Sequence, residues 1–261
     1  GCPVGYSGPT VTPAPETTPT PEGTTSTAES GTDTPSQTPA SHDSGGIEVT
    51  GGRLDFNAGQ VYDRMAGLLE TSAQGPERIR IRTLGGQSPA RMPVNDSGSF
   101  YDLFGLSSSN SDSGGTVAAY VARPSTVNVN AAILGDPRVE AILAHEYVHV
   151  VQKRTDAVSR LEASVPDQNT TDAEIVRTSV LEGVAVTVET RYWERHGYTG
   201  TTPAKGMEQS YAATEGARQW ISAPYYFGYE YVQTRTTSPT ATDALYDDPP
   251  QTSEELVHGL P

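Results

Sequence analysis

Two histidines four positions apart, with a glutamate directly after the first, carry the clearest chemical signal in the sequence: His145, Glu146 and His149. In a helix, side chains at this spacing lie one turn apart on one face, so both imidazoles can reach one metal ion. Imidazole nitrogens bind Zn²⁺ at about 2.0–2.1 Å, and the glutamate then faces the water that the ion activates. The pattern therefore predicts zinc ligands at His145 and His149 and a general base at Glu146. The plainer interpretation, two histidines without a joint role, is disfavoured because apolar residues flank them and unpartnered buried polar groups are costly.

A catalytic zinc ion usually takes a third protein ligand and leaves its fourth position to water. No third histidine follows closely, since residues 150–155 read Val-Val-Gln-Lys-Arg-Thr, so a carboxylate is expected. Glu182 is the favoured candidate because it lies among apolar residues, and Gly183 and Ala185 beside it allow another helix to approach closely.

Three other glutamates compete with Glu182 for this role. Glu174 is assigned to a helix cap and Glu194 to a charged helix end. Glu189 lies two turns from Glu182, about 10 Å along the axis, so one ion cannot take both carboxylates. We interpret Glu189 as a residue that orients a ligand or pairs with an arginine.

Two long helices must position these side chains. The first is expected over residues 137–154, with Asp136 as its N-cap and a proline at its first position. The second is expected to begin at a capping box formed by Thr171 and Glu174 and to end near His196.

Shorter elements precede the two helices. Helical spacing of apolar residues predicts a helix over residues 58–71, and alternation predicts a strand over residues 78–84. Residues 107–115 are expected to form a loop. Residues 117–122 and 125–129 read as a hairpin interrupted by a proline. The expected fold class is α+β, mainly helical with a small mixed or antiparallel sheet.

The beginning of the chain has a different composition from the rest. Residues 1–52 contain no Lys or Arg, and residues 7–41 contain 11 Thr, 5 Ser and 7 Pro. Such a segment cannot build a core, so residues 1–50 are expected to form a disordered stalk ahead of a folded domain at 51–261. Gly1-Cys2 is similar to the end of a lipoprotein signal, which predicts a lipid on Cys2. The stalk is typical of O-glycan carriers.

The charge of the chain excludes one class of partner. Its net charge is −15 and its pI is about 4.6, with 32 acidic and 17 basic residues. Nucleic-acid binding requires clustered Lys and Arg, so we expect no nucleic-acid partner. Such an acidic composition favours a protein kept soluble in concentrated salt.

Several stretches resemble one family of zinc enzymes. Residues 145–152, HEYVHVVQ, followed by residues 181–185, LEGVA, are similar to the HExxHxxQ and Glu-Gly-x-Ala helices of gluzincin-type metallopeptidases. The resemblance continues through residues 226–229 and the acidic tail at 248–258, and it covers roughly residues 54–258. It implies a zincin-like fold in which an active-site helix and a second long helix together supply the ligands.

By this resemblance His145, His149 and Glu182 bind Zn²⁺, and Glu146 is the general base. The tail at 236–261 would pack near the cleft, although read alone it looks like a disordered acidic end. A capping box at residues 252–255 could start a short helix that presents His258 as the group that stabilises the oxyanion. Four tyrosines remain alternatives for that role: Tyr225, Tyr226, Tyr229 and Tyr231.

The resemblance implies a zinc metallopeptidase that cleaves protein or peptide substrates, and the lipoprotein-like start of the chain predicts that it is extracellular and anchored to the outer face of the membrane through Cys2. The substrate would add as a strand near residues 117–122. The overall composition is similar to that of surface proteins of salt-loving archaea. The alternative is a catalytically inactive cell-surface binding or structural module that keeps the zinc site. The intact Glu146 favours the enzyme, because an inactive site has no need of it.

Overall fold

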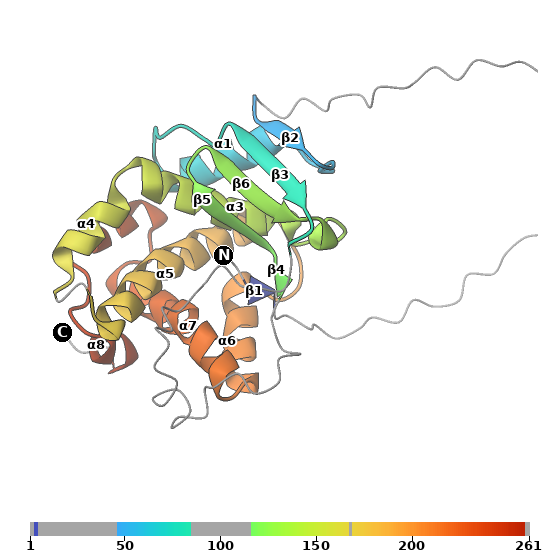
Figure 1. Cartoon of the computed structure of the whole chain (residues 1–261). Helices are drawn as coiled ribbons and strands as arrows, with labels where there is room; N and C mark the ends of the chain where they lie inside the picture. The colour runs from blue at the N-terminus through green and yellow to red at the C-terminus, as the bar shows by residue number, and fades with distance from the viewer. Residues whose placement is uncertain (1–2, 5–45, 85–115, 167–168, 259–261) are drawn as a thin grey trace, which may run out of the picture. The chain divides into compact units, whose positions relative to one another are not determined.

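The structure is a computed structural model, and it describes residues 3–4, 46–84, 116–166 and 169–258 (Figure 1). The chain divides into a unit formed by Gly1–Tyr6 with Asp43–Pro261 and a second unit, Ser7–His42. The second unit lies outside the described residues, as do Cys2 and the expected loop at 107–115. Of the expected stalk at 1–50, the structure describes residues 3–4 and 46–50, which include two short strands, so the folded domain begins a few residues before the predicted boundary at residue 51.

Helices make up most of the described chain. Their bounds are α1 (Ala58–Leu69), α3 (Val139–Arg154), α4 (Ala157–Ser164), α5 (Thr171–Arg195), α6 (Pro203–Ala213), α7 (Ala217–Arg235) and α8 (Ser253–His258), with 3₁₀ helices η1 (Ala131–Ile133) and η2 (Pro239–Tyr246). Among the described residues, no helix is both long enough and apolar enough to cross a bilayer.

The strands form a four-stranded sheet and a separate two-stranded pair. They are β1 (Pro3–Val4), β2 (Glu48–Thr50), β3 (Arg78–Arg82), β4 (Thr116–Val117), β5 (Ala119–Arg123) and β6 (Thr126–Asn130). The order of the larger sheet is β2-β3-β6-β5, and β1 pairs with β4. Strands β2, β3 and β6 run parallel and β5 runs antiparallel to β6, so the sheet is mixed. The expected mainly helical fold with a small sheet is thus confirmed at this level.

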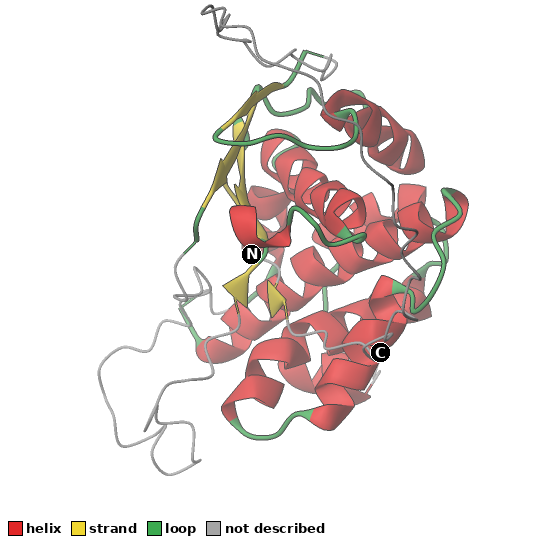
Figure 2. Ribbon diagram, turned by 90° about the vertical axis from the view of Figure 1, so that its right-hand side faces the viewer, coloured by secondary structure: helices red, strands yellow, loops and turns green. Residues whose placement is uncertain are grey.

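The sheet is apolar on one face. Ile79 and Ile81 of β3 are buried and pair with Val127 and Val129 of β6. Strand alternation directs all four side chains to the same side, where they join one hydrophobic core with α1, α3 and α5. Figure 2 shows the sheet at one side of the molecule, with the helices gathered against it. This core holds α3 in place behind β5, the strand at the sheet's edge.

The expected hairpin is confirmed. Strand β5 pairs with β6 through Ala119 and Val129 at one end and through Arg123 and Thr126 at the other. The register shifts between Val121 and Arg123, directly before the proline that cannot donate to the ladder. The element predicted at residues 58–71 is also confirmed, as α1.

Helices α5 and α7 approach each other at two glycines. A Cβ added to Gly183 would lie 2.3 Å from the carbonyl carbon and oxygen of Gly228, and one added to Gly228 would lie 2.0 Å from the carbonyl oxygen of Ser179. Real Cβ atoms do not come this close to backbone, so only glycine fits at both positions. The helix that was expected to approach closely at Gly183 is therefore α7. Its packing fixes the position of the part of α5 that carries Glu182.

Substituting Gly183→Ala should lower the free energy of unfolding by about 3 kcal/mol or more, because the added methyl group meets backbone that cannot rotate away. Gly67→Ala on α1 is a matched control, since its Cβ would meet nothing within 4 Å. The control should be neutral or stabilising by about 0.5–1 kcal/mol. Denaturant unfolding of both variants measures the difference. Equal stability of the two variants would show that α5 and α7 do not pack as described.

Both long helices begin one or two residues away from the predicted positions. Helix α3 begins at Val139 rather than at residue 137, although Asp136 accepts hydrogen bonds from the backbone N–H of Arg138 at 2.8 Å and from its guanidinium. These bonds lower the pKa of Asp136. Helix α5 is capped by Thr170, not by Thr171, through a 3.1 Å bond from the backbone N–H of Ala173. The bond to Thr170 thus places the cap of α5 one residue earlier than predicted.

The described part of the acidic tail is folded, in contrast to its reading as a disordered end. Tyr246 of η2 and Leu256 of α8 are buried in the core. Arg160 of α4 binds Asp243 at 2.6 Å and Asp247 at 2.7 Å, which fixes η2 against the domain. The short helix expected after residue 252 is present as α8, and the hydroxyl of Thr252 accepts from the backbone N–H of Glu255.

Candidate metal centre

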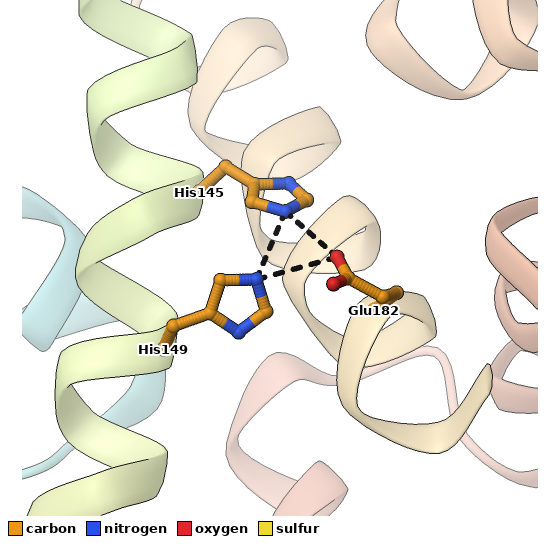
Figure 3. Close-up of side chains that lie close together, drawn as sticks. All are labelled: His145, His149 and Glu182. Carbon is orange, nitrogen blue, oxygen red and sulfur yellow. Dashed lines mark hydrogen bonds and ion pairs between the residues drawn. The ribbon is translucent and has the colours of Figure 1, made fainter. Parts of the chain in front are cut away.

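Helices α3 and α5 bring three predicted ligands together (Figure 3). Glu182 Oε2 lies 3.2 Å from His145 Nε2 and 3.3 Å from His149 Nε2. The two Nε2 atoms are 3.2 Å apart. Within the described residues these are the side chains that form a potential metal site.

His145 is oriented from behind by Glu189. Its Nδ1 atom lies 3.0 Å from Oε2 of Glu189, one of the glutamates that competed for the third ligand position. A carboxylate only accepts hydrogen bonds, so Nδ1 carries the proton and Nε2 presents its lone pair to the cluster. Of the two expected roles of Glu189, the ligand-orienting one is therefore observed, and its partner is an imidazole rather than an arginine.

His149 is oriented in the same way by an amide. Its Nδ1 atom lies 2.7 Å from Oε1 of Gln152. The Gln152 amide nitrogen donates to the carbonyl of Leu181 at 3.0 Å and to the hydroxyl of Tyr246 at 2.9 Å, which turns the amide oxygen toward the imidazole. His149 Nδ1 is thus also a donor, and His149 Nε2 also presents its lone pair.

The roles of Gln152 and Tyr246 were not predicted. The position of Gln152, three residues after His149, is a usable signal, because residues at this spacing share a helix face. Tyr246 has no such signal, since it follows Gln152 by 94 positions and reaches it only in the folded chain.

Three acceptor atoms therefore converge, which demands a positive charge among them. Burial raises the pKa of Glu182, but when the imidazoles are protonated, the positive charge of His149 and hydrogen bonds from both histidines outweigh burial and hold that pKa well below its ordinary value. Glu182 is thus ionised in a buried place. A proton on the imidazoles can supply the balancing charge, and a divalent ion bound by all three atoms can replace it.

Glu146, the predicted general base, directly follows His145 in α3. It is fully buried, and neither of its carboxylate oxygens has a hydrogen-bond partner among the described residues. Burying a carboxyl group without a hydrogen-bond partner lowers the free energy of unfolding by roughly several kcal/mol, unless water or a ligand binds to it. Its place next to His145 in α3 fits an expected role beside a metal.

The competing glutamates lie elsewhere. Glu174 pairs with Arg177, and Glu194 pairs with Arg191 at 2.9 Å. Both pairs are at helical i, i+3 spacing, as their assignment to helix ends implied. Neither glutamate contacts the histidines.

His258 is not brought to the cluster. It lies on α8 with 59% of its side chain exposed and pairs with Glu254 at 3.2 Å. The alternative tyrosines all lie on α7, where Tyr225 and Tyr231 are buried and Tyr226 stacks on Tyr211. No hydrogen bond joins His258 or these four tyrosines to the three ligands in the part of the chain that the structure describes.

Comparisons of the chain with protein-family models, with curated proteins and with solved structures give no match.

Proposed function

We propose that this protein is a zinc metallopeptidase with a zincin-like active site. The observation that carries the proposal is the convergence of His145, His149 and Glu182 through three lone-pair atoms, with the buried and unpartnered Glu146 in the same helix.

The donor set suits zinc. Two imidazole nitrogens and one carboxylate oxygen are the ligands of many catalytic zinc sites, which keep the fourth position for water. Ligand atoms about 2.05 Å from a tetrahedral zinc ion lie about 3.3–3.4 Å apart. The three distances between the ligand atoms, 3.2, 3.2 and 3.3 Å, agree with this spacing.

Each residue of the site then has a separate role in hydrolysis. A bound zinc ion supplies a Lewis acid that makes water acidic near neutral pH and polarises the scissile carbonyl. Glu146 accepts a proton from the attacking water, whose oxygen bonds to the carbonyl carbon. As the C–N bond breaks, Glu146 returns the proton to the leaving amine. Glu189 and Gln152 keep the two imidazoles in the tautomer and orientation that the metal requires.

The sheet edge offers a place for an extended substrate. Strand β5 is the last strand of its sheet among the described residues and packs against α3, so a peptide added to its outer edge would run beside the helix that carries the histidines. Strand β4 lies directly before β5 in the chain, and it pairs antiparallel with β1. The chain therefore already pairs one extended segment, β1, with the strand next to β5.

In this proposal the enzyme acts outside the cell, held to the outer face of the membrane by a lipid on Cys2 and presented by the Thr/Pro/Ser-rich segment at 7–41. The acidic surface keeps it soluble at high salt.

Hydrolysis of an unfolded protein by the purified chain should depend on one equivalent of zinc. A chelator should abolish cleavage, and zinc at the concentration of the protein should restore it, because the site has one set of three ligands. Mass spectrometry of the products and metal analysis of the protein measure both quantities at several salt concentrations. A chain that binds one zinc ion but cleaves no unfolded protein would overturn the peptidase and support a non-catalytic surface module.

A further inference from the structure

Arginines gather on the outer face of the sheet. In β3 the isoleucines are buried in the core, and strand alternation directs Arg78, Arg80 and Arg82 to the opposite face. Arg80 and Arg82 are exposed. Arg123, at the end of β5, is exposed as well.

One of these arginines reaches the edge strand. Arg82 lies on β3, two strands from β5, but its guanidinium hydrogen-bonds to the hydroxyl of Tyr120 on β5 and lies 5.7 Å from the centre of the Tyr120 ring. The side chain of Arg82 therefore crosses β6, and its positive charge lies over the edge strand β5. Arg123 belongs to the same strand.

Most of these arginines form no ion pair with the described part of the chain. The chain has 32 acidic and 17 basic residues, and arginines elsewhere in the described residues, such as Arg64, Arg138 and Arg160, bind carboxylates. On this face Arg78 binds Glu48 at 2.6 Å. Arg80, Arg82 and Arg123 have no carboxylate partner within the described residues. In so acidic a chain, three exposed arginines without a carboxylate partner among the described residues form a positive patch that can bind an external anion.

We propose that the substrate is an acidic polypeptide, whose carboxylates bind Arg82 and Arg123 while its backbone pairs with the edge of β5. This inference rests on the proposed function and names its substrate class. Neighbouring strands lie about 4.8 Å apart, and directly opposite side chains have Cβ atoms about 4.5–5.5 Å apart. Every second side chain of an added strand therefore comes within reach of these two guanidinium groups, which favour carboxylates through paired hydrogen bonds.

The test uses two peptides with the same cleavage site, one with Glu and one with Gln at alternate positions. The wild-type chain should cleave the acidic peptide with about tenfold higher kcat/KM at low salt, mainly through KM, and the preference should shrink as salt screens the charges. The double variant Arg82→Gln/Arg123→Gln should lose the preference. The control Lys153→Gln/Arg195→Gln removes the same charge from exposed positions away from the sheet and should keep it.

Binding to the Glu146→Gln variant, measured by fluorescence anisotropy, separates the two proposals. Tighter binding of the acidic peptide that is lost when Arg82 and Arg123 are also replaced supports acidic recognition. If the wild-type chain nevertheless cleaves neither peptide, only the peptidase proposal fails. Cleavage of both peptides at equal rates, or a preference that survives in the Arg82→Gln/Arg123→Gln variant, overturns acidic recognition and leaves the peptidase proposal standing.

Discussion

Replacing Glu146 with Gln should reduce kcat for peptide hydrolysis by about 10²–10⁴-fold while zinc stays bound. The amide has nearly the same shape as the carboxylate but cannot accept the proton of the attacking water. Since the Glu146 carboxylate oxygens have no hydrogen-bond partner in the described structure, the substitution breaks no observed contact. The loss of rate should therefore occur without a loss of stability.

Steady-state kinetics, zinc content and thermal unfolding of the Glu146→Gln variant measure these effects together. Glu194→Gln is the matched control, because this glutamate is exposed on α5 and pairs only with Arg191 among the described residues. It should retain full activity. If Glu146→Gln kept activity within threefold of wild type, Glu146 would not be the general base.

Glu182→Gln should remove most of the stabilisation that zinc provides. At a free zinc concentration of 100 times Kd, the wild-type protein should gain about 2.7 kcal/mol, which corresponds to a rise in Tm of roughly 5–11 °C for a domain of this size. The amide removes the negative charge that binds the ion, so the variant should show a rise of under about 2 °C at the same zinc concentration. Calorimetry with and without zinc provides the measurement.

Glu189→Gln is the comparison that separates a ligand from a residue behind it. Glu189 contacts His145 Nδ1 but not the ligand atoms, so its loss should weaken zinc binding by about 10–100-fold. A higher zinc concentration should then recover the full rise in Tm. An undiminished zinc effect in Glu182→Gln, or a larger loss in Glu189→Gln than in Glu182→Gln, would mean that the ligand has been assigned to the wrong carboxylate.

The cluster of His145, His149 and Glu182 could be predicted from sequence because its signals are local. His145 and His149 share a helix face by spacing alone. Glu182 stood out from the other glutamates of α5 because a carboxylate among apolar residues needs a cation to offset its burial. The same reasoning placed Glu174 and Glu194 at helix ends, where the structure shows them paired with arginines.

Other features depend on contacts between distant parts of the chain. Strand β2 has only three residues, too few for a pattern, and its parallel pairing with β3 becomes evident only in the folded sheet. The hydrogen bond from Gln152 to Tyr246 and the reach of Arg82 to Tyr120 join separate elements. The cap of α5 was placed one residue late because Thr170 and Thr171 are both suitable N-caps, and only the folded chain shows that Thr170 makes the bond.

The central claim is that the Glu182 carboxylate on α5 completes a zinc site begun by the imidazoles of His145 and His149 on α3. Anomalous diffraction at the zinc edge, from crystals grown with one zinc ion per chain, tests it directly. We expect one strong peak about 2.0–2.2 Å from His145 Nε2, His149 Nε2 and one oxygen of Glu182. A peak without Glu182 among its ligands, or no peak between the two helices, would contradict it.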